Sequence, residues 1–138
     1  MAKTAEQQAV AGLSPAVTAT IERNETFRFE ALTLLELGRN KLAAIEAKPP
    51  ADSSSVGVAA LEPFHLGVKA VLAGKGYKAY GTRGTLDLLR ILYRSALPEE
   101  RVQSYIGVQA LRIQGAKSLA AARAFLDTAA SLLGNAAR

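Results

Sequence analysis

The residues best suited to chemistry lie in a glycine-rich loop, GKGYKAYGTRG, at positions 74–84. Lysines and an arginine alternate there with tyrosines, a pattern that supplies positive charge for phosphates and flat rings for stacking on bases. Two arginines of the following helix extend the pattern. The sequence therefore predicts an anion or nucleic-acid contact made by Lys75, Tyr77, Lys78, Tyr80, Arg83, Arg90 and Arg94.

Charge is concentrated in the same part of the chain. Residues 69–94 hold six cations and one acid, Asp87, which gives the segment +5, equal to the formal net charge of the 138-residue protein. An anionic partner is expected to meet the chain here. A plainer interpretation is that Arg90 and Arg94 form an exposed stripe in which Arg90 pairs weakly with Asp87.

Known phosphate-binding loops do not fit the glycine-rich segment. A P-loop needs GxxxxGK followed by Ser or Thr, and here Gly76 and Gly81 have the spacing but Thr82-Arg83 follow. A dinucleotide fingerprint starting at Gly74 fails at Ala79, where the third glycine is required. Two other interpretations stay open: a flexible loop between helices, and a loop whose tyrosines contact a protein partner.

Residues for catalysis or metal binding do not form a recognisable set. His65 is the only histidine, cysteine is absent, and the apolar neighbours of His65 place it at the edge of a core. The adjacent Glu99 and Glu100 are better explained as acids at a helix start. The sequence has no GxSxG motif. We therefore predict a protein that is not an enzyme and has no metal site or cofactor.

The surrounding pattern predicts an all-α fold. Ser14-Pro15 starts a helix and Lys48-Pro49-Pro50 ends it, so one long helix is expected over 15–47. A short helix is expected from Pro63 to about Ala73, and another capped by Thr85 and buried on nearly every side. A last helical region follows Pro98, and Gly107 and Gly115 are points at which it can divide. The predicted organisation is an arm at 1–14, the long helix at 15–48, a Pro/Ser linker at 49–57 and a body of three to four helices at 58–138.

Apolar side chains on these helices suggest contacts between subunits. Phe29 is the one large apolar group on the polar side of the first helix, although it can also pack at the edge of that helix's own stripe. The last helix repeats leucine at seven-residue spacing, a short seam of the coiled-coil kind. The predicted homo-oligomer interface consists of Phe29, Leu89, Leu92, Leu119, Leu126 and Leu133.

No signal peptide is evident at the N-terminus, and no window offers about 18 uninterrupted apolar residues, so the chain is expected to be soluble when synthesised. The amphipathic stretch 117–138 also allows contact with a membrane surface. The long polar-faced helix, the Pro/Ser linker and the glycine-punctuated apolar helices resemble, in style, the small cysteine-free helical proteins inside tailed-phage particles, including ejection proteins. That resemblance implies a subunit of a ring or tube. The leading prediction is a structural protein that self-assembles, with other subunits of a larger assembly as further partners. Nucleic-acid binding and membrane contact are the alternatives.

Overall fold

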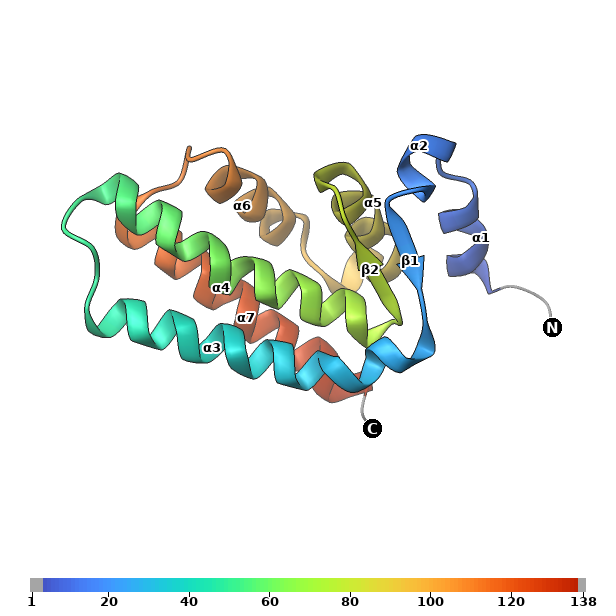
Figure 1. The fold of residues 1–138 in the computed structure, drawn as a ribbon, viewed down its shortest axis with the longest axis horizontal. Coiled ribbons are helices and arrows are strands. Elements are labelled where there is room, and N and C mark those ends of the chain that lie inside the picture. Colours follow the sequence, from blue (N-terminus) through green and yellow to red (C-terminus); the bar gives the residue numbers. More distant parts are fainter. Residues whose placement is uncertain (1–3, 137–138) are drawn as a thin grey trace.

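A computed structural model describes residues 4–136 and is predominantly helical, which confirms the all-α prediction. Three long helices lie side by side along the long axis of the molecule: α3 (Ala31–Ala47), α4 (Ser53–Gly74) and α7 (Gly115–Ala136) (Figure 1). Both α3 and α7 pack along α4, which makes α4 the central helix. An 18-residue window of α4 is apolar enough to cross a membrane, but 61% of it is buried inside the protein, as in a core helix.

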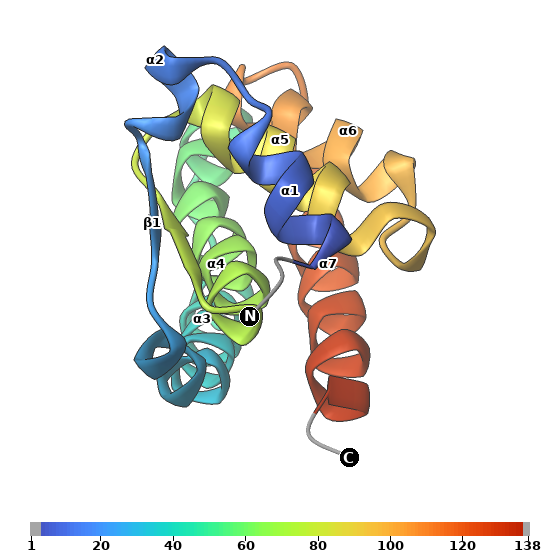
Figure 2. The same ribbon diagram turned by 90° about the vertical axis from the view of Figure 1, so that its right-hand side faces the viewer.

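The remaining elements cover one side and one end of this three-helix layer. α6 (Glu99–Gln109) packs on α4 and α7. Figure 2 views the molecule from the end where the small elements lie, some of them beside α5 and others beside α3 and α4. These elements are α1 (Ala5–Ala11), α2 (Pro15–Thr18), β1 (Ile21–Arg23), the 3₁₀ segment η1 (Glu25–Glu30), β2 (Tyr77–Ala79), α5 (Thr82–Tyr93) and the 3₁₀ turn η2 (Arg94–Ala96).

The predicted single helix over 15–47 is wrong. Helix α2 ends at Thr18, and β1 pairs antiparallel with β2, with Ile21 opposite Ala79 and Arg23 opposite Tyr77. Asn24 then accepts a hydrogen bond from the Thr26 backbone N–H (3.0 Å) and starts η1. Local sequence permits a helix here, but pairing with a distant strand satisfies the same backbone groups.

Three other boundaries also differ from the prediction. The predicted arm contains α1, which packs on α5, while residues 1–3 lie outside the described part. The linker is shorter, because α4 starts at Ser53 and runs through Pro63, whose fixed φ suits a helix although it lacks one donor. The glycine-rich loop contains β2, and α5 begins at Thr82, before the predicted cap Thr85.

The predicted division of the last helical region is confirmed between Gly107 and Gly115. The chain leaves α6 and turns back, so that the backbone N–H groups of Arg112 and Ile113 donate to the Gly107 carbonyl (2.8 and 3.1 Å). Gly115 has a φ of +60°, a conformation that favours glycine, and α7 starts there. Helix α7 can therefore reverse direction and pack against α4.

The core lies where α3, α4 and α7 meet. The ring of Phe64 lies 5.1 Å from the rings of both Tyr105 and Phe125, measured between centroids. Leu126 sits against Gly38 and Gly67: a Cβ added at Gly67 would lie 2.8 Å from the Leu126 Cδ2 atom. The glycines let three helices approach closely around one leucine, and the chain completes this core by itself.

Candidate ligand cavity

Four of the five cations predicted to contact an anion take part in ion pairs within the chain, while the fifth, Arg94, is exposed. Lysines and arginines of the loop pair with acids from other elements or from α5 itself, at distances typical of surface ion pairs. Such acids lower the local positive potential that a phosphate backbone would meet. These pairs are Lys75–Glu6 (3.6 Å), Lys78–Glu30 (3.4 Å), Arg83–Asp87 (3.8 Å) and Arg90–Glu99 (2.9 Å).

The two loop tyrosines occupy different environments. Tyr77, on β2, is only 4% exposed and belongs to the core, so its ring is not free to stack on a base. Tyr80 is 69% exposed, and its hydroxyl donates to Glu22 Oε1 at 3.3 Å. Lys78 places its ammonium over the ring of Phe27, 4.3 Å from the centroid. Of the two tyrosines, only Tyr80 is exposed enough to stack on a ligand or a partner.

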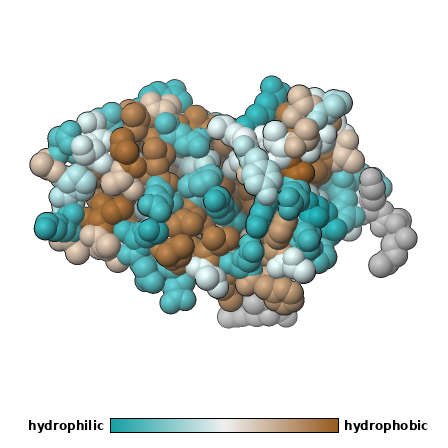
Figure 3. Space-filling model, viewed as in Figure 1, coloured by the Kyte–Doolittle hydropathy of each residue, from teal (hydrophilic) through white to brown (hydrophobic). Residues whose placement is uncertain are grey.

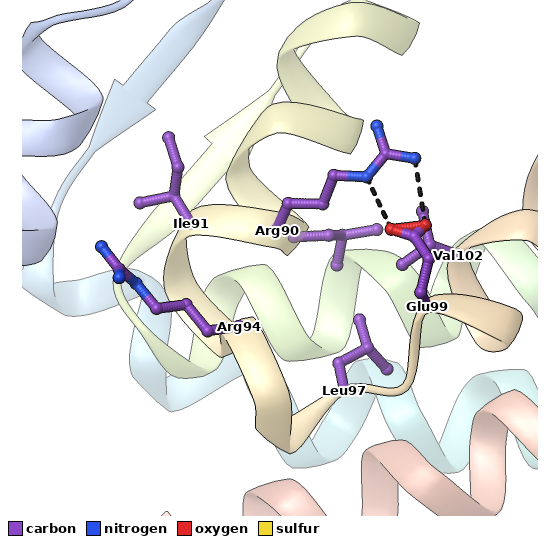
Figure 4. A pocket seen from close by; sticks show the side chains of 7 residues that line it. Arg90, Ile91, Arg94, Leu97, Glu99 and Val102 are labelled. Carbon is purple, nitrogen blue, oxygen red and sulfur yellow. Dashed lines mark hydrogen bonds and ion pairs between the residues drawn. The ribbon is translucent and has the colours of Figure 1, made fainter.

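Arg90 and Arg94 do not act together. Figure 4 shows Arg90 reaching Glu99 at the start of α6 while Arg94 points away from that pair. The hydrogen bonds from Arg90 hold the pKa of the Glu99 carboxyl below its usual value. Asp87 forms its ion pair with Arg83, one turn earlier, and Arg90 crosses to Glu99 on another helix, so the predicted Arg90–Asp87 contact is reduced to a Coulombic attraction.

Most of the predicted oligomer contacts lie inside the chain. Leu89, Leu92, Leu126 and Leu133 are buried in the core, and Leu119 is half-buried against it. Leu89, Leu92, Leu126 and Leu133 are thus used by the chain's own helices, because the same apolar spacing serves them. The prediction for the half-buried Leu119 stays open. Helix α7 also packs its apolar face against the chain's own core, so little of that face is left to contact a membrane. Of the segment 117–138 that was predicted to contact a membrane, residues 137–138 lie outside the described residues. Phe29 differs, since it is 86% exposed.

Helix α5 is also less enclosed than predicted. Leu88, Leu89 and Leu92 are buried, whereas Arg83 and Arg90 are exposed on the opposite side. The helix packs on α1 and β2 at one end of the molecule. Gly84, in its first turn, lies so close to Thr20 that an added Cβ would come within 2.6 Å of the Thr20 Oγ1 atom.

A cavity of about 500 Å³ lies between α4, β2, α6 and the first turn of α5. A second hollow of about 750 Å³, between α4 and α6, shares His65, Thr82, Tyr105 and Gln109 with it. In Figure 3 the outline of the molecule is notched between α6 and the start of α5. The two hollows therefore join into one groove whose shared residues come from three helices.

A hydrogen-bond chain crosses the point that the two hollows share. Gln109 Nε2 donates to the Tyr105 hydroxyl oxygen at 3.0 Å, and that oxygen lies 2.7 Å from His65 Nδ1. Since the Tyr105 oxygen accepts from Gln109, its own proton is available for His65 Nδ1. In the tautomer in which Tyr105 donates to Nδ1, the neutral imidazole carries its proton on Nε2, which makes no hydrogen bond with any described residue.

Burial and charge both keep His65 neutral. Burial lowers the pKa of His65, and the positive charge of Lys69, one turn later on α4, lowers it further. Burial raises the pKa of the Tyr105 hydroxyl to about 12, so it stays protonated at neutral pH. The groove thus presents uncharged hydrogen-bonding groups beside one lysine.

Charged groups around the cavity leave it slightly positive. Its lining contains two lysines, Lys69 and Lys78, and one acid, Glu30, which pairs with Lys78. Lys69 is exposed and forms no ion pair within residues 4–136. The first turn of α5, which also lines the cavity at Thr82, has no side-chain cap at Gly81.

The arrangement can bind a hydrogen-bond acceptor but does not assemble a catalytic set. The buried hydroxyl of Thr85, near the start of α5, donates to the Gly81 carbonyl at 2.8 Å and is not paired with His65. No cluster of three or more metal-ligating side chains occurs among the described residues. The prediction that His65 lies at the edge of the core is confirmed by its half-burial. Tyr105 and Gln109 were not predicted as site residues. Their four-residue spacing on α6 is the one local signal.

Comparison of the chain with protein-family models, with curated proteins and with solved structures finds no match. Fold and groove define the protein only as a helical one with a core of its own and a groove that contains polar groups.

Proposed function

We propose that the protein is a non-enzymatic helical interaction protein whose copies associate through the outer face of η1 and the start of α3. One observation carries this proposal: Phe29 is 86% exposed and Leu32, three residues later, is 58% exposed. Side chains at this spacing are neighbours on a helical surface. Burying two such side chains removes apolar area from water at about 25 cal/mol per Å².

Charge supports a second copy as the partner on this face. Residues 25–41 contain three acids (Glu25, Glu30, Glu36) and three bases (Arg28, Arg39, Lys41), so the segment is neutral in a protein of net charge +5. Two identical basic proteins repel each other least where they present neutral surfaces. A two-fold contact here would also bury Phe29 from both copies. A virion or ejection setting, which the resemblance implies, stays a prediction, as do nucleic-acid and membrane contact.

Light scattering behind a sizing column, at low and high salt, tests the association. We expect a discrete oligomer that survives high salt, because apolar burial does not weaken on screening. Phe29→Ser should give a monomer with an unchanged melting temperature. Leu111→Ser, which changes an exposed leucine in the α6–α7 connection, is the matched control and should leave the oligomer intact. A monomeric wild-type protein would contradict the proposal.

A further inference from the structure

The groove between α4 and α6 reaches Glu30 and Leu34, but Phe29 and Leu32 of the association face do not line it, and it contains an imidazole nitrogen without a hydrogen bond among the described residues. His65 is held at Nδ1 by Tyr105, and Tyr105 is held by Gln109 (2.7 and 3.0 Å). This chain fixes the imidazole ring, and when Tyr105 donates to Nδ1 the imidazole proton lies on Nε2, which has no partner among the described residues. A half-buried N–H group of this kind is suited to a ligand that accepts a hydrogen bond.

The nearest free charge selects an anionic acceptor. Lys69 follows His65 by four residues on α4, so both side chains lie on one helical face, and both line the cavity. The acids around the groove already have partners: Glu30 pairs with Lys78 (3.4 Å) and Glu62 with Lys41 (3.2 Å). The Lys69 ammonium is left for a ligand.

Apolar side chains form part of the groove's wall. Leu34 of α3 lines the cavity, and Leu61 of α4 and Ile106 of α6 line the hollow that joins it; all three are half-buried and so reach the open space. A volume of about 500 Å³ falls within the range of small-molecule sites in proteins, which combine apolar walls with a few placed polar groups. The walls suit a hydrocarbon chain or ring better than a hydrated ion.

We propose that the cavity binds a small amphipathic carboxylate. The carboxylate accepts hydrogen bonds from His65 Nε2–H and the Lys69 ammonium, and the hydrocarbon body packs on the half-buried Leu34, Leu61 and Ile106 of the joined groove. Tyr105 and Gln109 are positioning residues, because they fix the imidazole ring and its proton.

Decanoate is the test ligand. 1-Decanol, which has the hydrocarbon chain without the carboxylate, and acetate, which has the carboxylate without the long chain, are the controls. The protein has a single histidine, so nuclear magnetic resonance of the full chain reports one set of imidazole signals, all from His65. Decanoate should shift those signals, and calorimetry should give a Kd that Lys69→Met weakens about tenfold, as loss of a charged hydrogen-bond partner implies. Lys117→Met, which removes an exposed charge on α7 away from the cavity, should leave the Kd within about twofold.

1-Decanol should bind about tenfold more weakly than decanoate and should not respond to Lys69→Met. Three results would each overturn the proposal: decanoate leaves the His65 signals unmoved, both lysine variants weaken binding equally, or 1-decanol binds as tightly as decanoate. Phe29→Ser should leave decanoate binding unchanged, because Phe29 does not line the cavity. Failure of the ligand proposal is therefore distinguishable from failure of self-association.

Discussion

The imidazole of His65 on α4 and the phenol of Tyr105 on α6 are stacked, with ring planes 10° apart, and joined by a hydrogen bond of 2.7 Å. Gln109 completes the chain from the next turn of α6. This contact links two helices that are far apart in the sequence, and it places polar atoms within a largely apolar interior. It contributes to the stability of the fold as well as to the groove.

Tyr105→Phe should lower the free energy of unfolding by about 1–3 kcal/mol, because it removes the hydroxyl that satisfies both His65 Nδ1 and Gln109. Chemical denaturation measures the change. Tyr80→Phe is the control: its hydroxyl bonds to Glu22 at the surface, and its loss should cost about 0.5 kcal/mol or less. Equal effects of the two variants would show that the hydrogen-bond chain of His65, Tyr105 and Gln109 stabilises the fold no more than a surface hydrogen bond does.

Stability should fall as the pH drops below about 6.5, the ordinary pKa of histidine. Burial and Lys69 lower the pKa of His65 in the folded protein, so just below pH 6.5 the unfolded chain binds a proton that the folded protein does not. Unfolding is then favoured, with a slope of at most about 1.4 kcal/mol per pH unit, until the pH passes the folded pKa.

Denaturation from pH 7.5 to 5 of the wild type and His65→Asn measures this effect. Asn keeps a polar group near the position of Nδ1 but does not titrate, so its stability should change less over this range. Lys69 is the charged group that lowers the pKa of His65, and Glu62, Glu30 and Lys78 line the same hollows. All four stay in the variant, so their contributions cancel in the difference. Parallel curves for the two proteins would contradict the assignment.

Leu126→Ala should unfold the protein more readily, by about 2–5 kcal/mol, without changing its oligomeric state. Leu126 is 1% exposed and packs where α3 and α4 approach α7 at Gly38 and Gly67. Thermal denaturation and light scattering measure the two properties. Leu37→Ala, at an exposed position of α3, should cost far less. Dissociation of an oligomer by Leu126→Ala, with a normal melting temperature, would restore the interpretation of this seam as a subunit contact.

Several features could be read from local sequence because local physics sets them. The helix start at Ser14-Pro15, the stop before Pro49 and the division between Gly107 and Gly115 all lie at residues that the backbone treats specially. The predominance of helix follows from the same signals. Prediction failed between Thr18 and Ala31, where the partner of β1 is a distant strand and no local signal identifies it.

For the candidate site, too, local features could be predicted from the sequence, whereas contacts between distant segments could not. Composition and spacing identified the basic loop, but not the acids that pair with it: Glu6, Glu30 and Glu99 come from α1, η1 and α6. The leucine spacing of α7 showed that one face must be buried, while only the tertiary structure decided that α3 and α4 bury it. His65 and Tyr105 meet only because α6 packs on α4. A sequence determines what a segment must bury, whereas the partner that buries it depends on contacts between residues far apart in the chain.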